Sequence, residues 1–219
     1  MTTGTYLCLE GVGGCGKSTQ IVLLAAWLRA RGIEPAIVKE PGLTPFGTKV
    51  RELAIGTEEI TPLTEAFLFE ADRSHTFGST VLPTLQQGRW VVSDRSPFGT
   101  IVFQGILGGV DQDLIDAMTF AATAGHLPDL ALLIDLSAEE AHRRAQARAE
   151  QDDKFDARGL GFFEKMRVAY LTVAELYPER IEVVAGEQPP EQVHEAIVEC
   201  VGARLLSGSG TAATKHSGR

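Results

Sequence analysis

Long apolar runs are missing from this sequence. No uninterrupted hydrophobic stretch approaches the roughly 18–20 residues that a membrane-spanning helix requires. The amino-terminal segment MTTGTYLCLEG also lacks the basic region and the apolar core of a secretory signal peptide. Both absences favour a cytoplasmic protein that does not associate with membranes.

Cysteine is scarce as well. The chain of 219 residues contains three cysteines, Cys8, Cys15 and Cys200, an odd number without the paired spacing of zinc ligands. This count argues against a disulfide scaffold and against a structural zinc site.

Positive charge is in short supply, because 20 Lys and Arg residues stand against 29 Asp and Glu residues and give a formal net charge of −9. An acidic surface repels the phosphate backbone, so nucleic acid is not an expected partner. An anionic ligand would need a local site made of backbone N–H groups and a few placed cations.

The composition is that of a folded domain, with 44% hydrophobic and 22% charged residues. A chain of this length corresponds to one domain and can bury about 70% of the surface that it exposes when unfolded. We therefore predict a single domain over residues 1–206. Residues 207–219 are small and polar, which predicts a disordered tail.

Short β-branched and apolar runs alternate with longer helical patterns along the chain. Continuous apolar runs such as ALLID are typical of parallel strands that are covered on both faces. We expect strands at Tyr6–Glu10, Ala36–Lys39, Trp90–Asp94, Leu130–Asp135 and Ile181–Val184.

Helical patterns separate these expected strands. The first helix follows residue 16, has an apolar face of Ile21, Leu24, Ala25 and Leu28, and ends at Gly32. A second covers 62–87. A third begins at Ser137, with Glu140 as its capping-box partner, and a fourth begins at Pro190. The alternation predicts an α/β fold, a doubly wound parallel sheet of five strands flanked by helices. In such folds ligands bind at the carboxyl ends of the strands.

The strongest motif is GVGGCGKS, which begins at residue 11 and matches the phosphate loop G-x-x-x-x-G-K-[ST]. An expected strand precedes it and an amphipathic helix follows, as the motif requires. Its backbone N–H groups can wrap a phosphate, Lys17 can reach the β- and γ-phosphates, and the Ser18 hydroxyl can join a Mg²⁺ shell. The expected ATP-binding residues are Gly11, Gly13, Gly14, Cys15, Gly16, Lys17, Ser18 and Thr19.

A phosphate loop alone fits a kinase, a GTPase, a motor or a nucleotide sensor. The guanine-reading Asn/Thr-Lys-x-Asp motif of a GTPase does not follow a strand here, and a motor is normally longer. Two further expected strand ends carry charged residues. Asp94 can orient Mg²⁺ or receive a proton, Arg95 beside it can grip a second phosphate, and Glu40 lies in an irregular Pro-Gly turn.

Further along the chain, Phe69 and Arg73 lie four residues apart and share one face of the expected helix. An aromatic ring can stack on a base, and a guanidinium can donate to a base carbonyl. An apolar helix face is more often core, which explains Phe69 as well but explains Arg73 poorly.

Taken in order, these motifs resemble the thymidylate kinases over nearly the whole body of the chain. The matching segments are the phosphate loop, Lys39-Glu40-Pro41-Gly42, Phe69-x-x-x-Arg73, Asp94-Arg95 followed by Gln104, and a basic segment with Arg143, Arg144, Arg148 and Lys154. The resemblance implies an ATP-dependent kinase that uses Mg²⁺, converts dTMP to dTDP, and forms a homodimer. It implies a lid at about 143–160.

The resemblance also implies a role for each candidate residue. Arg148 in the lid would act on the transferred phosphoryl group together with Lys17, Asp94 and Arg95, and Arg144 would contact ATP. Ser18 and Asp94 would hold the metal. The pyrimidine nucleoside monophosphate would bind Glu40, Phe69, Arg73, Arg95 and Gln104.

Three residues depart from the family pattern. Gly13 replaces an acidic residue near the sugar 3′-hydroxyl, Ser96 replaces an aromatic residue next to the sugar, and Lys39 replaces an arginine. These departures leave two alternatives open: a kinase of a different or modified pyrimidine nucleotide in specialised metabolism, and a nucleotide-dependent sensor that transfers no phosphate.

Overall fold

Five parallel strands form the centre of the computed structural model, which describes residues 4–56, 59–147, 155 and 158–206. The strands are β1 (Tyr6–Glu10), β2 (Ala36–Lys39), β3 (Val91–Asp94), β4 (Leu130–Asp135) and β5 (Ile181–Ala185). Their order across the sheet is β2-β3-β1-β4-β5, and every neighbouring pair is parallel. The predicted five-stranded parallel sheet is therefore confirmed, with boundaries shifted by one residue at Trp90 and Ala185.

Helical segments follow each strand. The α-helices are α1 (Lys17–Arg29), α2 (Pro45–Ile55), α3 (Pro62–Thr76), α4 (Leu82–Gln86), α5 (Pro97–Thr100), α6 (Gln112–Thr123), α7 (Ala138–Gln146), α8 (Leu160–Leu176) and α9 (Pro190–Val201). Wider π-helical turns occur in η1 (Phe77–Val81), η2 (Ile101–Ile106) and η3 (Gly202–Leu206).

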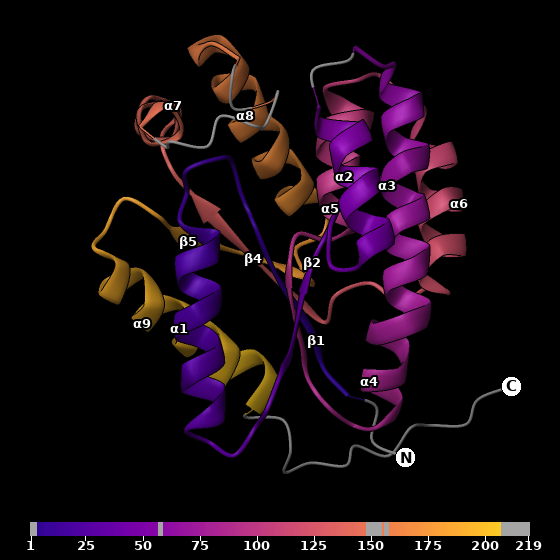
Figure 1. The fold of residues 1–219 in the computed structure, drawn as a ribbon. Helices are drawn as coiled ribbons and strands as arrows, with labels where there is room; N and C mark the ends of the chain where they lie inside the picture. Colours follow the sequence, from indigo (N-terminus) through magenta and orange to yellow (C-terminus); the bar gives the residue numbers. More distant parts are fainter. Residues whose placement is uncertain (1–3, 57–58, 148–154, 156–157, 207–219) are drawn as a thin grey trace, which may run out of the picture.

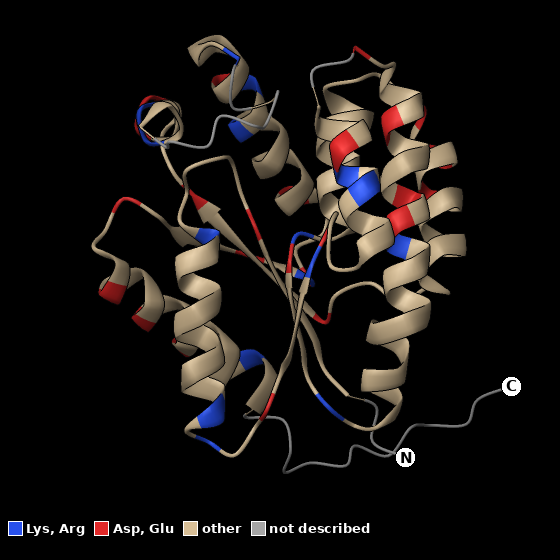
Figure 2. Ribbon diagram, viewed as in Figure 1, with Lys and Arg blue, Asp and Glu red and all other residues tan. Residues whose placement is uncertain are grey.

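These helices cover both faces of the sheet (Figure 1). Helices α1 and α9 pack together on one face, whereas α3, α6 and α8 lie on the other. The core between the layers includes all five residues of β1 and the first five of β4. The carboxyl end of β4 points toward α7 and α8, and Figure 2 shows basic residues on both helices.

Most of the predicted helices are confirmed. Residues Ile21, Leu24, Ala25 and Leu28 are buried on α1, and Pro190 opens α9. The predicted helix over 62–87 is present as the continuous run of α3, η1 and α4.

One cap was predicted wrongly. Ser137 precedes α7, but its side chain makes no capping hydrogen bond. Glu140, its expected partner, instead pairs with Arg143 and Arg144 at 2.7 and 2.6 Å. Two arginines on the next turn therefore outcompete the cap for this carboxylate.

Helices α2 and α6 were not predicted, although both carry start signals. The Thr44 hydroxyl accepts a hydrogen bond from the Gly47 N–H at 3.0 Å, and Pro45 occupies the first turn of α2. Asp111 caps α6 in the same way, through the Leu114 N–H at 3.1 Å.

Within the described part of the chain, no helix has the length and apolar character to span a membrane. The predicted tail at 207–219 lies outside the described residues.

Candidate active site

The phosphate loop joins the end of β1 to the start of α1, and its conformation requires glycine at two positions. Gly11 and Gly14 have φ values of 137° and 82°, which favour glycine. A Cβ atom at Gly11 would lie 2.7 Å from the Ile134 carbonyl oxygen, and one at Gly14 would lie 2.7 Å from the Ala141 carbonyl oxygen. The loop therefore packs against the end of β4 and against α7, with no space for side chains at these two positions.

Lys17 lies at the start of α1 and is held inside this loop. Its Nζ donates to the carbonyl oxygens of Gly11 and Val12 at 2.9 and 3.1 Å, and Cys15 Sγ lies 3.6 Å away. The side chain is buried, so its positive charge is concentrated at the loop instead of in solvent. Lys17 thus lies against the backbone of the loop, and its role toward a polyphosphate remains a prediction.

Ser18 and Asp94 are the predicted metal ligands. Ser18 is exposed in the first turn of α1, and Asp94 ends β3 in register with Leu9, at the strand end that leads to the loop. Hydroxyl and carboxylate oxygens are the donors that Mg²⁺ prefers. In residues 4–56, 59–147, 155 and 158–206, no group of three or more His, Cys, Asp or Glu residues could hold a metal alone. The donor set fits a Mg²⁺ ion that is also held by nucleotide phosphates and water.

Arg95 is anchored by a buried network that sequence reasoning missed. Its Nη1 donates to the Tyr170 hydroxyl at 2.6 Å and lies 3.6 Å from Glu10 Oε2. Glu10 is buried and also accepts hydrogen bonds from Tyr170 and Ser96 at 3.0 and 2.9 Å. Burial and the nearby Glu10 raise the pKa of Tyr170, so its hydroxyl remains a donor. Glu10 could have been noticed as a charged residue ending an otherwise apolar strand.

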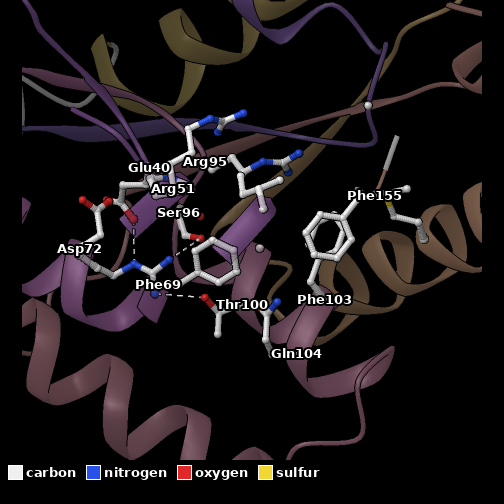
Figure 3. Close-up of a pocket in the computed structure, with 16 residues that line it drawn as sticks. Glu40, Arg51, Phe69, Asp72, Arg95, Ser96, Thr100, Phe103, Gln104 and Phe155 are labelled. Carbon is white, nitrogen blue, oxygen red and sulfur yellow. Dashed lines mark hydrogen bonds and ion pairs between the residues drawn. The ribbon is translucent and has the colours of Figure 1, made fainter. Parts of the chain in front are cut away.

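A pocket extends from Gly13 of the phosphate loop across the sheet edge to α3 and η2 (Figure 3). All five predicted acceptor residues line it: Glu40, Phe69, Arg73, Arg95 and Gln104. Gly13 and Ser96 line it too, whereas Asp94 is not among its lining residues. Phe69 is only half-buried and faces the pocket, which favours a binding role over a core role.

Other lining residues were absent from the prediction. Arg51 of α2 adds a second cation beside Arg95, and the Phe103 ring of η2 supplies an aromatic wall. Phe103 consequently gives the pocket an aromatic side chain even though position 96 is a serine. No local pattern marks these residues, because they reach the pocket only through the packing of α2 and η2.

Arg73 contacts four other residues in the pocket region through its guanidinium. Its Nε donates to Glu40 Oε2 at 2.8 Å, and its Nη1 pairs with Glu70 Oε1 and donates to Thr100 Oγ1 at 3.1 Å. Its Nη2 donates to the Ser96 carbonyl oxygen at 3.3 Å. Burial alone would lower the pKa of this guanidinium, yet Glu70 and Glu40 together raise it.

Glu40 and Glu70 are both buried and both pair with Arg73, so two negative charges share one positive charge. Burial, with a smaller contribution from the nearby Glu70 and Asp72, raises the pKa of Glu40 to about 7 against the lowering effect of Arg73. Protonation of Glu40 near neutral pH would leave Arg73 paired mainly with Glu70.

Gln104 is likewise held by a carboxylate. Its Nε2 donates to Glu65 Oε2 at 2.9 Å, and both side chains are buried. Helix α3 therefore supplies Phe69, Arg73 and the partner of Gln104.

The predicted lid is described only in part. Arg144 lies beside the phosphate loop, since its Cβ atom would be 3.1 Å from a Cβ at Gly14, and its Nε donates to Glu140. Arg143 is exposed and pairs with the same carboxylate. Arg148 and Lys154 lie outside the described residues.

A phosphate-loop motif with a buried lysine borders a pocket that is lined by aromatic rings and by several arginines. This combination defines a phosphotransferase of the P-loop class. A family model described as Thymidylate kinase matches residues 9–197. The chain belongs to the thymidylate kinase family, and its members are ATP-dependent phosphotransferases.

Individual relatives agree with this assignment. A thymidylate kinase of Parasynechococcus marenigrum is 38% identical over 203 residues, covering 89% of this chain and 95% of the relative. One from Alkalilimnicola ehrlichii is 37% identical over 95% of this chain and 99% of the relative. A third, from Nitratidesulfovibrio vulgaris, is 37% identical over 97% and 99%.

The raised pKa of Glu40 predicts how stability depends on pH. Because the folded pKa of about 7 exceeds the ordinary value of 4.5, the folded state binds more protons in this window. The stability that Glu40 contributes should therefore be fully present below pH 4.5 and lost as pH rises through about 7. The difference in unfolding free energy between wild type and Glu40→Gln should fall by up to about 1.4 kcal/mol per pH unit.

Urea unfolding of both proteins at several pH values between 4 and 8 measures this difference. A difference that grows with pH would show that Arg73 keeps Glu40 ionised throughout.

Proposed function

We propose that this chain transfers the γ-phosphoryl group of ATP to dTMP, giving dTDP. One observation carries the proposal: a single pocket joins the phosphate loop at Gly13 to a base-sized site at Phe69, Arg73 and Gln104. The relatives named thymidylate kinase and the family match support it. A modified pyrimidine acceptor and a non-catalytic sensor are not favoured.

The base would bind at the α3 end of the pocket. Phe69 stacks on the thymine ring, Arg73 donates to a ring carbonyl, and Gln104 bonds the adjacent ring nitrogen. Thr100 and Glu40, which lie outside α3, hold the Arg73 guanidinium in place, so it is already oriented before the substrate binds.

The acceptor phosphate would bind at the other end, between Arg95 and Arg51. Arg95 is pre-oriented by Tyr170 and Glu10, which limits the conformational freedom lost on binding. Two cations at this point oppose the net negative charge of the protein locally.

ATP would bind the loop from Gly11 to Thr19 with its phosphates against backbone N–H groups and Lys17. Arg144, which lies beside Gly14, would contact it from α7. Ser18 and Asp94 would hold Mg²⁺, which supplies charge neutralisation on the phosphate oxygens when bound. Arg148 would reach the transferred group from the lid.

The reaction then follows from position and charge. An oxygen of the acceptor phosphate attacks the γ-phosphorus, and the bond to the β–γ bridging oxygen breaks as ADP leaves. Lys17 and Arg95 stabilise the charge on the oxygens they touch, and neither forms a covalent bond. The rate enhancement comes from holding the two phosphates in line.

A coupled assay of ADP release over a panel of nucleoside monophosphates tests this function. We expect dTMP to give the highest kcat/KM, with weak loss for its 3′-deoxy analogue because Gly13 offers no carboxylate to the 3′-hydroxyl. A different preferred pyrimidine would support a specialised kinase. Tight ATP binding without stimulation by any acceptor would support a sensor.

Replacement of the loop lysine gives the sharpest test of the ATP site. Lys17→Ala should lower kcat about 10²–10³-fold, because one preorganised charge stabiliser is lost. Circular dichroism should show an unchanged fold, and Lys165→Ala on α8 serves as the matched control. Wild-type turnover in folded Lys17→Ala would contradict the assignment.

Alanine variants of Arg95 and Arg148 should differ in which kinetic constant they change. Arg95→Ala should raise the KM for dTMP strongly, because Arg95 contacts the acceptor in the ground state as well as in the transition state. Arg148→Ala should lower kcat with little change in KM, because the lid acts only on closure. Steady-state kinetics at saturating ATP measure both, and reversed profiles would mean that the roles are exchanged.

We also propose that the chain acts as a homodimer in the cytoplasm. Helices α2, α3 and α6 lie side by side, and each exposes a large apolar side chain: Leu53, Phe67 and Leu114. A second copy would cover this surface.

Light scattering after size exclusion checks the oligomeric state. Wild type should have twice the chain mass of 23.6 kDa. Phe67→Asp should give a monomer, whereas Val168→Asp, which changes an exposed apolar residue of α8, should remain dimeric. A monomeric wild type would refute the dimer.

A further inference from the structure

The hydrogen bond between Gln104 and Glu65 lies at the end of the pocket where the base would bind, and Gln104 is its donor. The Gln104 amide carries an acceptor oxygen at one side and a donor nitrogen at the other, and the two are equal in size. The contact of 2.9 Å uses the nitrogen. An ionised carboxylate can only accept hydrogen bonds, so Glu65 stabilises this orientation over the flipped one. The amide oxygen Oε1 is then left as the group that Gln104 offers to a ligand.

Burial makes this preference strong. Glu65 is 6% exposed and Gln104 is 1% exposed, so water cannot easily replace the contact. Flipping the amide would place an oxygen against the Glu65 oxygen in a low-dielectric site, which costs more than the loss of an exposed hydrogen bond.

The donors of the neighbouring Arg73 side chain are also fixed in direction. An arginine has five N–H donors, and four contacts of Arg73 use Nε, both N–H groups of Nη1 and one of Nη2. One N–H of Nη2 is left over from these four contacts. The pocket thus offers a donor from Arg73 and an acceptor from Gln104.

A donor from Arg73 beside an acceptor from Gln104 is complementary to one class of pyrimidine. A 4-oxo pyrimidine such as thymine presents an acceptor at O4 next to a donor at N3–H, whereas a 4-amino pyrimidine such as cytosine presents a donor next to an acceptor. With Gln104 turned the other way, its N–H would face N3–H of thymine.

We propose that Glu65 is a positioning residue that fixes the Gln104 amide with its oxygen toward the substrate, and that this selects 4-oxo over 4-amino pyrimidine nucleotides. The inference rests on the proposed function, since it assumes that the base lies against Arg73 and Gln104. Glu65 acts through Gln104 and has no contact with the reacting phosphates in this arrangement.

The first test is Glu65→Gln, which keeps the shape of the side chain. A glutamine at 65 can donate or accept, so the Gln104 amide can take either orientation. The ratio of kcat/KM for dTMP to that for dCMP should fall by about tenfold or more, mainly through KM for dTMP. Glu195→Gln, an exposed change on α9, is the matched control and should leave the ratio unchanged.

The second test exchanges the pair. In the double variant Glu65→Gln with Gln104→Glu, the amide at 65 donates to a carboxylate at 104, and residue 104 again offers only acceptors. The preference for dTMP over dCMP should return to within a few-fold of wild type. A purely structural role for Glu65 predicts recovery of the melting temperature without recovery of this ratio.

Two results would overturn the inference: an unchanged dTMP-to-dCMP ratio in folded Glu65→Gln, or a double variant that regains stability without selectivity. A wild type that does not use dTMP would instead refute the proposed function.

Should neither variant fold, wild type still provides a test with 5-fluoro-dUMP, whose N3–H is more acidic than that of thymine. Its kcat/KM, relative to that of dTMP, should fall as pH rises through the ionisation of the analogue. Equal use of the ionised analogue would show that Gln104 is not fixed as an acceptor.

Discussion

The acceptor half of the structure depends on the buried ion cluster around Arg73. This single guanidinium ties the turn after β2, the middle of α3 and the start of α5 through Glu40, Glu70 and the Ser96 carbonyl. Breaking such a cluster by removing one partner typically costs about 3–5 kcal/mol, because the remaining charge stays buried and unpaired. The same contacts that hold these elements together leave Arg73 rigid, so packing and recognition cannot be varied independently here.

The placement of charge explains how an acidic chain can bind two anionic nucleotides. Three cations of the site are fixed by neighbours: Lys17 by loop carbonyls, Arg95 by Tyr170, and Arg144 by Glu140. Acidic residues lie on α2, α3, α6 and α9 (Figure 2), and two of those at the site, Glu40 and Glu70, are paired with Arg73. Local geometry rather than net charge therefore decides which ligands can bind.

The sheet and the phosphate loop could be predicted from the sequence, because both depend on local patterns. Apolar runs identify strands that are buried on two faces, and three of the five strands have the predicted bounds. Phe69 and Arg73 follow from the resemblance to the thymidylate kinases, and their four-residue spacing on a helix agrees with it. Arg51 and Phe103 were missed because only tertiary packing brings them to the pocket, whereas Glu10 carries a local signal as the charged end of an apolar strand. The capping box at Ser137 failed because its partner was also four residues from an arginine.

Arg95 has a φ angle of 79°, in a region that side chains other than glycine rarely adopt. Such a conformation costs of order 1–3 kcal/mol, and glycine would remove most of that cost. A glycine could not make the contacts with Gly11 and Tyr170, nor carry a charge to the pocket. Glycine at position 95 would also leave the buried Glu10 carboxylate without its cation, which costs more than the strain that is relieved. Stability and activity therefore both favour arginine at this strained position, and engineering for a higher melting temperature gains nothing from glycine there.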